Sequence, residues 1–393
     1  MSRSIEPVPR AELERRWAAA DSIMQAHGLD ALVMQNAQDW LGGYVRWFTG
    51  APANAGYPRC VIHFGAGDMT IIEQGGRGEV RARDPSSLGA PGVRESRHSP
   101  SYVSVAYTAR TDAEIAYDVL KGRGAARVGW VSPAGAYFKF GETLTRLMGP
   151  AAFRDVTDEI DAVKAVKSPY EQELIGRTAR LQDEVLARLR AFIRPGLRDF
   201  EVAAYAQYVA STLGAEQGIY INSSGPPGEA AVFRPHAQQG RTLEAGDLFA
   251  ILVETNGPGG YYTEIARTFS LGPPPAEVVE ATRVVVDAQA YTLERLLPGA
   301  GCREVADQHD AYMTARGLAP EIRLYCHGQG YDMVERPLIR QDEGMSIAAG
   351  MNIALHPGFV TRAVNGLITD NYLVCGDEPP RRLHQTPQDV LVV

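Results

Sequence analysis

Two strand-like runs on either side of a glycine-rich turn constrain the fold more than any other segment of this chain. The runs are GDLFAILVE (residues 246–254) and YTEIARTF (residues 262–269), with Asn-Gly-Pro-Gly-Gly between them. Asn-Gly and Gly-Gly favour tight chain reversals, so the segment predicts a β-hairpin. Side chains alternate between the two faces of a strand, so Leu252 and Glu254 are expected to share one face.

The length of the chain and the order of its patterns predict two domains. The 393 residues are too many for one ordinary hydrophobic core. Strand-like runs such as LDALVMQ, RCVIHFG and MTIIEQG alternate with helical patterns early in the chain, which is typical of an α/β layer. A long helical stretch follows, with Ser168 as N-cap and Pro169 at the first helical position. The boundary is expected just before it, giving domains 1–160 and 161–393, the second of mixed α+β class.

The composition argues against nucleic-acid and membrane partners. The formal net charge is -8, and no apolar run approaches the roughly 18 residues of a membrane span. The opening MSRSIEPVPRAELERRW carries charges where a secretory signal has its apolar region, so a cytoplasmic location is expected. The cysteines show no C-x-x-C spacing, which argues against a zinc knuckle or a disulfide scaffold.

Five segments, two of them the strands of the predicted hairpin, carry a family resemblance. GDLFAILVE, GYYTEIARTF, CHGQG, AGMNIALHPG and GLITDNYLV occur in the order found in the creatinase, prolidase and methionine aminopeptidase family, which this chain resembles over nearly its whole length. The resemblance implies an N-terminal α/β domain of the creatinase and prolidase type. It also implies a C-terminal catalytic α+β domain with the pita-bread fold.

Peptidases of this family bind two divalent metals through two Asp, one His and two Glu. The resemblance places these five ligands at Leu252, Glu264, His327, His356 and Thr369. Leu252 cannot bind a metal and Thr369 binds one only weakly, so most of the negative charge that holds a metal pair is lost. We therefore expect no metal cofactor, as in creatinase. The alternative is one zinc or iron ion, held by Glu254 and the three titratable residues of this set. Asp370 follows Thr369 and is expected to face the other way.

The loop before the hairpin, AAVFRPHAQQGRTLEAGD, contains the predicted acid and base. The resemblance places the proton-transferring residue of creatinase in this loop, where His236 is the one candidate. Imidazole changes charge near neutral pH, so it can both accept and donate a proton. The residues expected to orient the substrate and the water are Glu264, Glu254, His327 and His356.

Four further residues are expected to bind substrate. Tyr262 falls where creatinase touches its substrate. Glu335 and Arg336 occupy the place of the family's H-E-x-P segment, and one or the other is expected to line the pocket. Arg59 resembles the creatinase arginine that reaches the neighbouring subunit's site and holds the substrate carboxylate, and Arg46 competes for this role. The resemblance thus implies a homodimer with shared active sites.

The main hypothesis is a creatinase-like, metal-independent hydrolase that cleaves a C–N bond in a small, polar, carboxylated substrate. One alternative is a metal-dependent Xaa-Pro dipeptidase, or a lyase of the same fold. Another is an inactive peptide-binding module, like the pita-bread domain of the FACT histone chaperone. The titratable groups at and beside the ligand positions argue against the inactive module.

Overall fold

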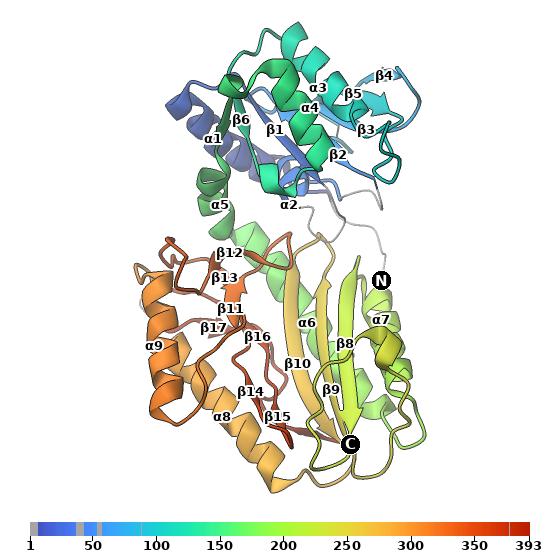
Figure 1. Cartoon of the computed structure of the whole chain (residues 1–393), viewed down its shortest axis with the longest axis vertical. Coiled ribbons are helices and arrows are strands. Elements are labelled where there is room, and N and C mark those ends of the chain that lie inside the picture. The colour runs from blue at the N-terminus through green and yellow to red at the C-terminus, as the bar shows by residue number, and fades with distance from the viewer. Residues whose placement is uncertain (1–6, 37–42, 53–56, 88, 377) are drawn as a thin grey trace. The chain divides into compact units, whose positions relative to one another are not determined.

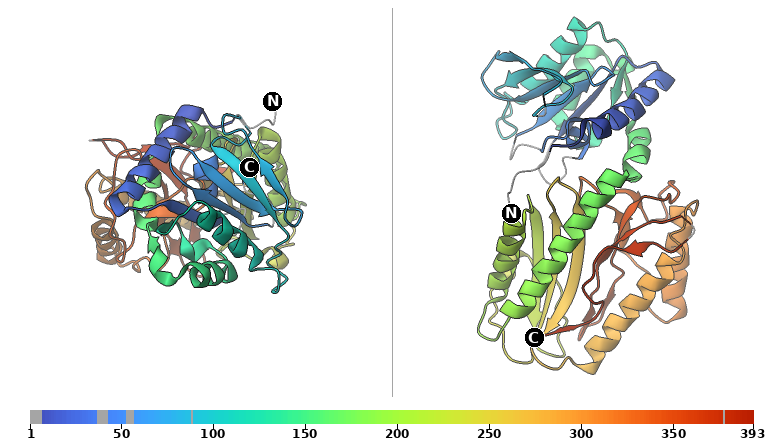
Figure 2. Two further views of the ribbon diagram at one scale, coloured as in Figure 1. Left: turned by 90° about the horizontal axis from the view of Figure 1, so that it is seen from above. Right: turned by 180° about the vertical axis from the view of Figure 1, so that it is seen from behind.

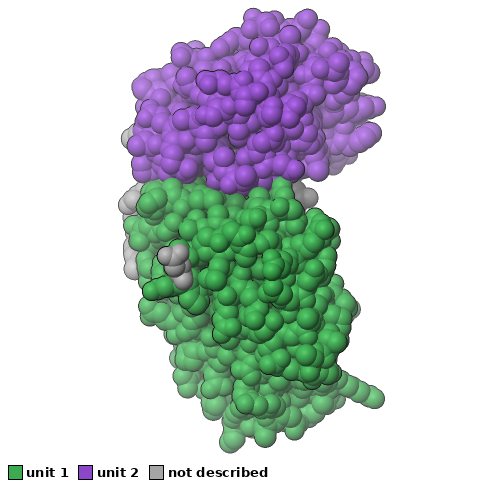
Figure 3. Space-filling view, turned by 90° about the vertical axis from the view of Figure 1, so that its left-hand side faces the viewer, with its two compact units in different colours: residues 1–5, 165–393 green, residues 6–164 purple. Residues whose placement is uncertain are grey.

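The computed structural model describes residues 7–36, 43–52, 57–87, 89–376 and 378–393. The chain forms two compact units, which divide between residues 164 and 165 (Figure 3). The boundary predicted from the sequence was residue 160. No helix in the described part of the chain is both long enough and apolar enough to cross a lipid bilayer.

The N-terminal unit contains one sheet with helices packed on it (Figure 1). Its strands are β1 (Ala31–Asn36), β2 (Arg59–His63), β3 (Met69–Gln74), β4 (Val80–Ala82), β5 (Val93–Ser99), β6 (Val128–Trp130) and β7 (Phe153–Asp155). They lie in the order β4-β5-β3-β2-β1-β6-β7. Its helices are α1 (Arg10–His27), α2 (Gly43–Thr49), α3 (Thr111–Gly122), η1 (Pro133–Gly135), α4 (Phe138–Met148), η2 (Pro150–Ala152) and α5 (Thr157–Ala165). The predicted α/β class is confirmed, with the first three predicted strands at β1, β2 and β3.

The second unit contains two larger sheets and a small strand pair. The first sheet has the order β18-β10-β9-β8 and consists of β8 (Gly218–Gly225), β9 (Leu248–Asn256), β10 (Tyr262–Ser270) and β18 (Leu391–Val392). The second has the order β12-β11-β13-β16-β17 and consists of β11 (Cys326–Gly328), β12 (Glu335–Leu338), β13 (Asn352–Leu355), β16 (Asp370–Leu373) and β17 (Arg381–Arg382). The small pair is β14 (Phe359–Val360) with β15 (Asn365–Gly366). The helices are α6 (Pro169–Phe192), α7 (Asp199–Leu213), η3 (His236–Gln238), α8 (Ala276–Leu293) and α9 (Cys302–Ala315).

The start of α6 follows the predicted pattern. The Ser168 hydroxyl accepts a hydrogen bond from the Glu171 backbone N–H at 3.2 Å, and the Glu171 carboxylate accepts one from the Ser168 N–H at 2.7 Å. This reciprocal capping box satisfies two backbone donors that the first helical turn would otherwise leave unpaired.

The predicted hairpin is formed by β9 and β10, which pair antiparallel with Glu264 opposite Glu254 and Ala266 opposite Leu252. The odd-numbered side chains of β9, such as Ile251 and Val253, pack into a core with α6 and α7, which cover one face of the sheet (Figure 2). The even-numbered residues therefore point to the opposite face, where the candidate site lies.

The two sheets meet where β10 approaches the start of β16. Ala266 and Thr369 exchange backbone hydrogen bonds of 3.2 and 3.3 Å there. This bridge places the site face of the hairpin against the strands that carry the two candidate histidines.

Candidate active site

Three titratable side chains converge at the junction of the two sheets. Glu264 comes from β10, His327 from β11 and His356 from the residue after β13. The Glu264 Oε1 lies 3.7 Å from the His327 Nε2 and 3.5 Å from the His356 Nε2, and the three ligand atoms all lie within 4.8 Å of one another. Ligands held about 2.0–2.1 Å from a tetrahedral zinc are themselves about 3.3 Å apart, so these separations fit one small divalent ion.

The protonation of the histidines also suits a metal. The His327 Nδ1 lies 3.0 Å from the carbonyl oxygen of Gly328, which can only accept, so Nδ1 carries the proton and Nε2 presents its lone pair towards Glu264. Burial lowers the pKa of His327 to about 4. Burial and the neighbouring His327 together lower the pKa of His356 well below its usual range. Both imidazoles are therefore neutral near pH 7, which metal binding requires.

The H-G-x-G glycines explain how His327 reaches this position. The register of β11 against β12 shifts between His327 and Gly328. A Cβ added to Gly328 would lie 2.5 Å from the carbonyl oxygen of Arg336 on β12. Glycine thus allows the two backbones to approach closely beside the histidine.

Two carboxyl groups face each other across the hairpin, where Glu254 lies directly opposite Glu264. Burial raises the pKa of Glu264 well above its usual range, and the nearby Glu254 adds to this effect. Burial also raises the pKa of Glu254 to about 8, although a 2.8 Å hydrogen bond from Gln329 opposes the shift. The described residues provide no lysine or arginine partner for either group, and the buried Glu264 Oε1 accepts no hydrogen bond from them. Such a pair of buried carboxyls favours a bound cation.

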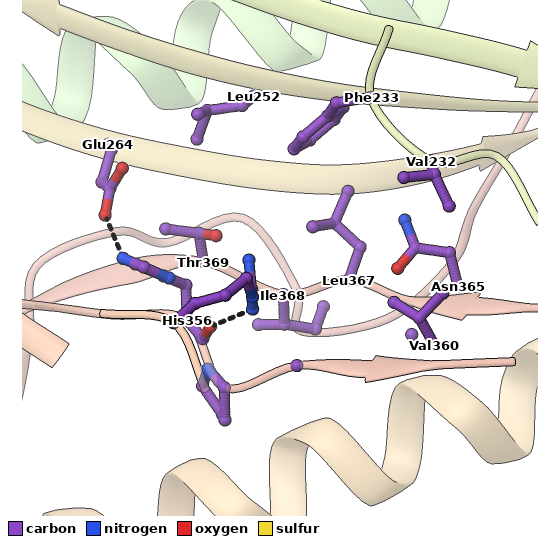
Figure 4. A pocket seen from close by; sticks show the side chains of 14 residues that line it. Val232, Phe233, Leu252, Glu264, His356, Val360, Asn365, Leu367, Ile368 and Thr369 are labelled. Carbon is purple, nitrogen blue, oxygen red and sulfur yellow. Dashed lines mark hydrogen bonds and ion pairs between the residues drawn. The ribbon is translucent and has the colours of Figure 1, made fainter. Parts of the chain in front are cut away.

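A cavity of about 290 Å³ opens beside this cluster (Figure 4). Glu264, His356 and Thr369 line it together with Leu252. The remainder of its wall is largely apolar and includes Val232, Phe233, Val360, Leu367 and Ile368. Leu252 and Thr369 thus lie beside the cluster, as the resemblance implied, but Leu252 adds no ligand atom. Any metal here has fewer protein ligands than a two-metal site needs.

Asp370 faces away from the cavity, as expected from strand alternation. Its carboxylate forms a fully buried ion pair with Arg267 at 2.8 Å, and the His384 Nδ1 lies 3.3 Å from it. This carboxylate therefore has a structural role behind the sheet and does not replace Thr369 as a ligand.

His236 lies apart from the cluster in the structure. It is exposed on η3 and lines a different cavity, of about 640 Å³, together with Tyr220 and Gln239. Phe233 lines both cavities, so the loop that carries His236 borders the candidate site. Its role in proton transfer stays a prediction from the sequence.

The predicted substrate-binding residues of the second unit occupy different surroundings. Tyr262 is buried on the same strand face as Glu264, two residues away. Glu335 forms a buried ion pair with Lys167 at 2.8 Å, and Arg336 pairs with Glu343. Glu335 and Arg336 therefore hold the backbone around β12 and do not appear among the residues that line the 290 Å³ cavity.

Of the two candidate arginines of the N-terminal unit, Arg59 has partners within that unit. Arg59 pairs with Glu73 at 3.1 Å and donates to the carbonyl oxygen of Pro52 at 2.9 Å. Arg46 is buried on α2. The predicted contact with a second subunit, and with it the homodimer, stays a prediction.

Comparison with known proteins identifies the family. Residues 173–375 match metallopeptidase family M24. That match covers more than half of the chain. The chain belongs to metallopeptidase family M24.

Individual M24 relatives resemble this chain at low identity. The uncharacterized peptidase YqhT of Bacillus subtilis (strain 168) is 21% identical over 284 residues, which are 70% of this chain and 78% of that protein. The Xaa-Pro dipeptidase of Pyrococcus furiosus is 24% identical over 242 residues, 61% of this chain and 68% of that protein. The crystal structure of X-Pro aminopeptidase from Thermotoga maritima MSB8 matches with a TM-score of 0.77 at 18% identity, covering 96% of this chain and 99% of that one. The predicted pita-bread fold and its family are thereby confirmed.

The family corrects two predictions. M24 is a family of metallopeptidases with Xaa-Pro dipeptidases among the relatives, and three side chains that could hold an ion converge in this chain, so the prediction of a metal-independent, creatinase-like hydrolase without a cofactor is wrong. The prediction took Leu252 and Thr369, which replace two of the family's five ligands, as reason to expect no metal, and kept one zinc or iron ion as the alternative. The remaining Glu264, His327 and His356 still form a compact set, and three protein ligands suffice for a catalytic ion.

Sequence reasoning missed the polar residues behind the cluster. Gln329 follows His327 by two residues and donates to Glu254, while Asn371 follows Thr369 by two and accepts from the backbone of Glu264 at 2.7 Å. Period-two spacing from a predicted site residue was the available signal.

Proposed function

We propose that this protein is a metal-dependent peptidase that hydrolyses the C–N bond of a dipeptide-sized substrate with a single divalent ion. Glu264, His327 and His356 would hold the ion. The observation that carries the proposal is the convergence of one buried carboxylate and two neutral imidazoles, opposite a second buried carboxyl and without a lysine or arginine partner among the described residues.

The donor set favours zinc or iron. Two imidazole nitrogens and one carboxylate oxygen form the ligand sets of many catalytic zinc sites and of non-haem Fe(II) sites. Mg²⁺ and Ca²⁺ prefer sites made only of oxygen ligands. When bound, such an ion supplies Lewis acidity and makes water nucleophilic near neutral pH.

Glu254 is the proposed base. Gln329 donates to its Oε1, and the described residues donate no hydrogen bond to Oε2, which is therefore available for a proton. A cation held by the three ligands favours the ionised form of the neighbouring Glu254, and as water attacks the scissile carbonyl carbon, the Glu254 Oε2 accepts the water proton. As the C–N bond breaks, the same oxygen returns the proton to the leaving nitrogen.

The cavity restricts the substrate. Its volume of about 290 Å³ lies at the lower end of the range for ligand sites, so it suits one or two residues. The apolar wall suits an aliphatic or proline side chain, in agreement with the Xaa-Pro specificity in the names of two relatives. Arg323 also lines the cavity, with 58% of its side chain exposed, and its guanidinium suits a substrate carboxylate.

The test is hydrolysis of a dipeptide panel, with and without a C-terminal proline, before and after treatment with a chelator. We expect chelation to lower the rate by at least about 100-fold and one equivalent of Zn²⁺, Fe²⁺, Co²⁺ or Mn²⁺ to restore it. Full activity of the metal-stripped protein would contradict the proposal. Hydrolysis of none of the dipeptides by metal-loaded protein would contradict the substrate class.

A further inference from the structure

A chain of buried amide side chains runs behind the candidate active site. Gln329, Asn352 and Asn371 come from three different parts of the second sheet, and each is at most 1% exposed. The Gln329 Nε2 donates to the Glu254 Oε1 at 2.8 Å, and the Asn371 Nδ2 donates to the Gln329 Oε1 at 2.9 Å. The amide chain thus joins the second sheet to the Glu254 carboxylate and to the Glu264 backbone of the hairpin in the first sheet.

One backbone group determines the direction of the hydrogen bonds between these amide side chains. The Glu264 N–H can only donate, and its acceptor is the Asn371 Oδ1 at 2.7 Å. The Asn371 Nδ2 must then point to the oxygens of Gln329 and Asn352, the second at 3.1 Å. The Gln329 amide is thereby oriented with its Nε2 towards Glu254.

The backbone of Gln329 is fixed as well. Its N–H donates to the carbonyl oxygen of Asn352 at 3.0 Å, and its own carbonyl oxygen accepts from the Asn352 Nδ2 at 3.1 Å. Gln329 lies two residues after His327, and Asn352 lies four residues before His356. The amide chain is therefore tied to the segments that carry both histidines.

We propose that Gln329 is the positioning residue of the site: through its side chain it holds Glu254, and through Asn371 the backbone of Glu264, in register with the two histidines. The inference rests on the proposed function. It assigns to Gln329 no contact with metal or substrate. An amide in this place anchors the Glu254 carboxylate by a donated hydrogen bond and adds no charge, so the charge of the site stays available to a cation.

The opposite face of the same hairpin offers a matched control. Gln182 on α6 is fully buried, donates from Nε2 to the carbonyl oxygen of Thr263 at 2.6 Å and accepts at Oε1 from the Thr263 hydroxyl at 2.8 Å. Thr263 pairs with Thr255, so Gln182 supports the residues next to Glu254 and Glu264 from behind. Both glutamines can be replaced by methionine, which has a similar shape and cannot donate these bonds.

The experiment measures Zn²⁺ affinity by competition with a chelating dye, together with kcat on the best dipeptide of the panel and Tm, for Gln329→Met and Gln182→Met. Supporting hydrogen bonds around metal ligands are commonly worth about 10- to 100-fold in affinity or activity. We expect Gln329→Met to weaken Zn²⁺ binding and lower kcat by at least about 10-fold each. Gln182→Met should lower Tm and change both quantities by less than about 3-fold.

A double-mutant cycle separates positioning from a general loss of packing. In a Glu254→Gln background, Gln329→Met should lower kcat by much less than in the wild type, because the group it positions is already disabled. If Gln329→Met does not fold, Asn371→Asp takes its place in the experiment. This variant keeps the acceptor for the Glu264 N–H and removes the donor that orients Gln329, so the same loss of Zn²⁺ affinity is expected.

Three outcomes would overturn the positioning role of Gln329, and a fourth would overturn the proposed function as well. Equal effects of the two methionine variants, or fully additive losses of kcat in the cycle, overturn the role of Gln329 while leaving the metallopeptidase proposal intact. Unchanged Zn²⁺ affinity in Asn371→Asp overturns it as well. A wild-type protein that binds neither Zn²⁺ nor Co²⁺ and hydrolyses no dipeptide overturns the proposed function, and the positioning role falls with it.

Discussion

Replacing Glu264 with glutamine is expected to lower dipeptide turnover by at least about 10³-fold, because the loss of metal removes about 4 kcal/mol or more of transition-state stabilisation. Glutamine keeps the size of the side chain and removes the charge. Glu264 is the one carboxylate in the set of three ligands, so its neutral variant leaves two imidazoles, which cannot retain the ion tightly. The measurements are kcat/KM and metal content after gel filtration.

Glu171→Gln is the control for this experiment. Glu171 is also buried, but it caps α6 and accepts a hydrogen bond from Tyr261 at 2.8 Å, away from the ligands. This variant should lose stability and retain its metal. A Glu264→Gln protein that keeps a full complement of metal and more than about a tenth of wild-type turnover would show that the ligand set is wrong.

Replacing Glu254 with glutamine should give the opposite combination, with metal retained and turnover lost. A positioned acid or base typically contributes about 10²- to 10⁴-fold, and we expect kcat to fall within this range. Glu254 lies opposite Glu264 but outside the group of three converging ligands, so the ion should stay bound. The test is kcat at saturating dipeptide together with metal content.

His236→Ala tells the two candidate bases apart. His236 is exposed and lines the neighbouring cavity, so its removal should cost less than the removal of Glu254 if Glu254 moves the proton. A Glu254→Gln enzyme with near-native kcat, beside an inactive His236→Ala enzyme, would return the role to the histidine. The loop would then have to bring His236 to the site when substrate binds.

Local patterns made much of the fold predictable. The glycine-rich turn between Glu254 and Tyr262 and the alternation on either side of it predict a hairpin, because turn chemistry and side-chain period act over a few residues. Ser168 and Glu171 predict the start of α6 for the same reason. These interactions do not depend on which distant segments meet.

The prediction of a site without metal was wrong because the sequence shows which ligand positions have changed but not how close the remaining ligands lie to one another. Leu252 removes one ligand of a metal pair, yet the distances among Glu264, His327 and His356 depend on how two sheets meet at the bridge between Ala266 and Thr369. No pattern in one chain reveals that packing. Three ligands at these separations are enough for one ion.

The amide chain was unpredictable for a related reason. Gln329 and Asn371 are far apart in the sequence, and their hydrogen bond exists only because β13 lies between β11 and β16. Buried amides are satisfied by specific partners, and such partners follow from sheet order rather than from composition. Both residues lie in segments that carry the family resemblance, CHGQG and GLITDNYLV, but nothing in those segments predicts that the two side chains meet.

The number of ions per chain tests the central claim most directly. Protein stripped with a chelator, loaded with excess Zn²⁺ and desalted should contain one tightly bound zinc per chain by elemental analysis, and Glu264→Gln should contain none. Glu264, His327 and His356 provide the ligands for one ion. A second ion would lack a bridging carboxylate, because Leu252 occupies that ligand position. Two zinc ions per chain, or full peptidase activity with no metal bound, would contradict the account.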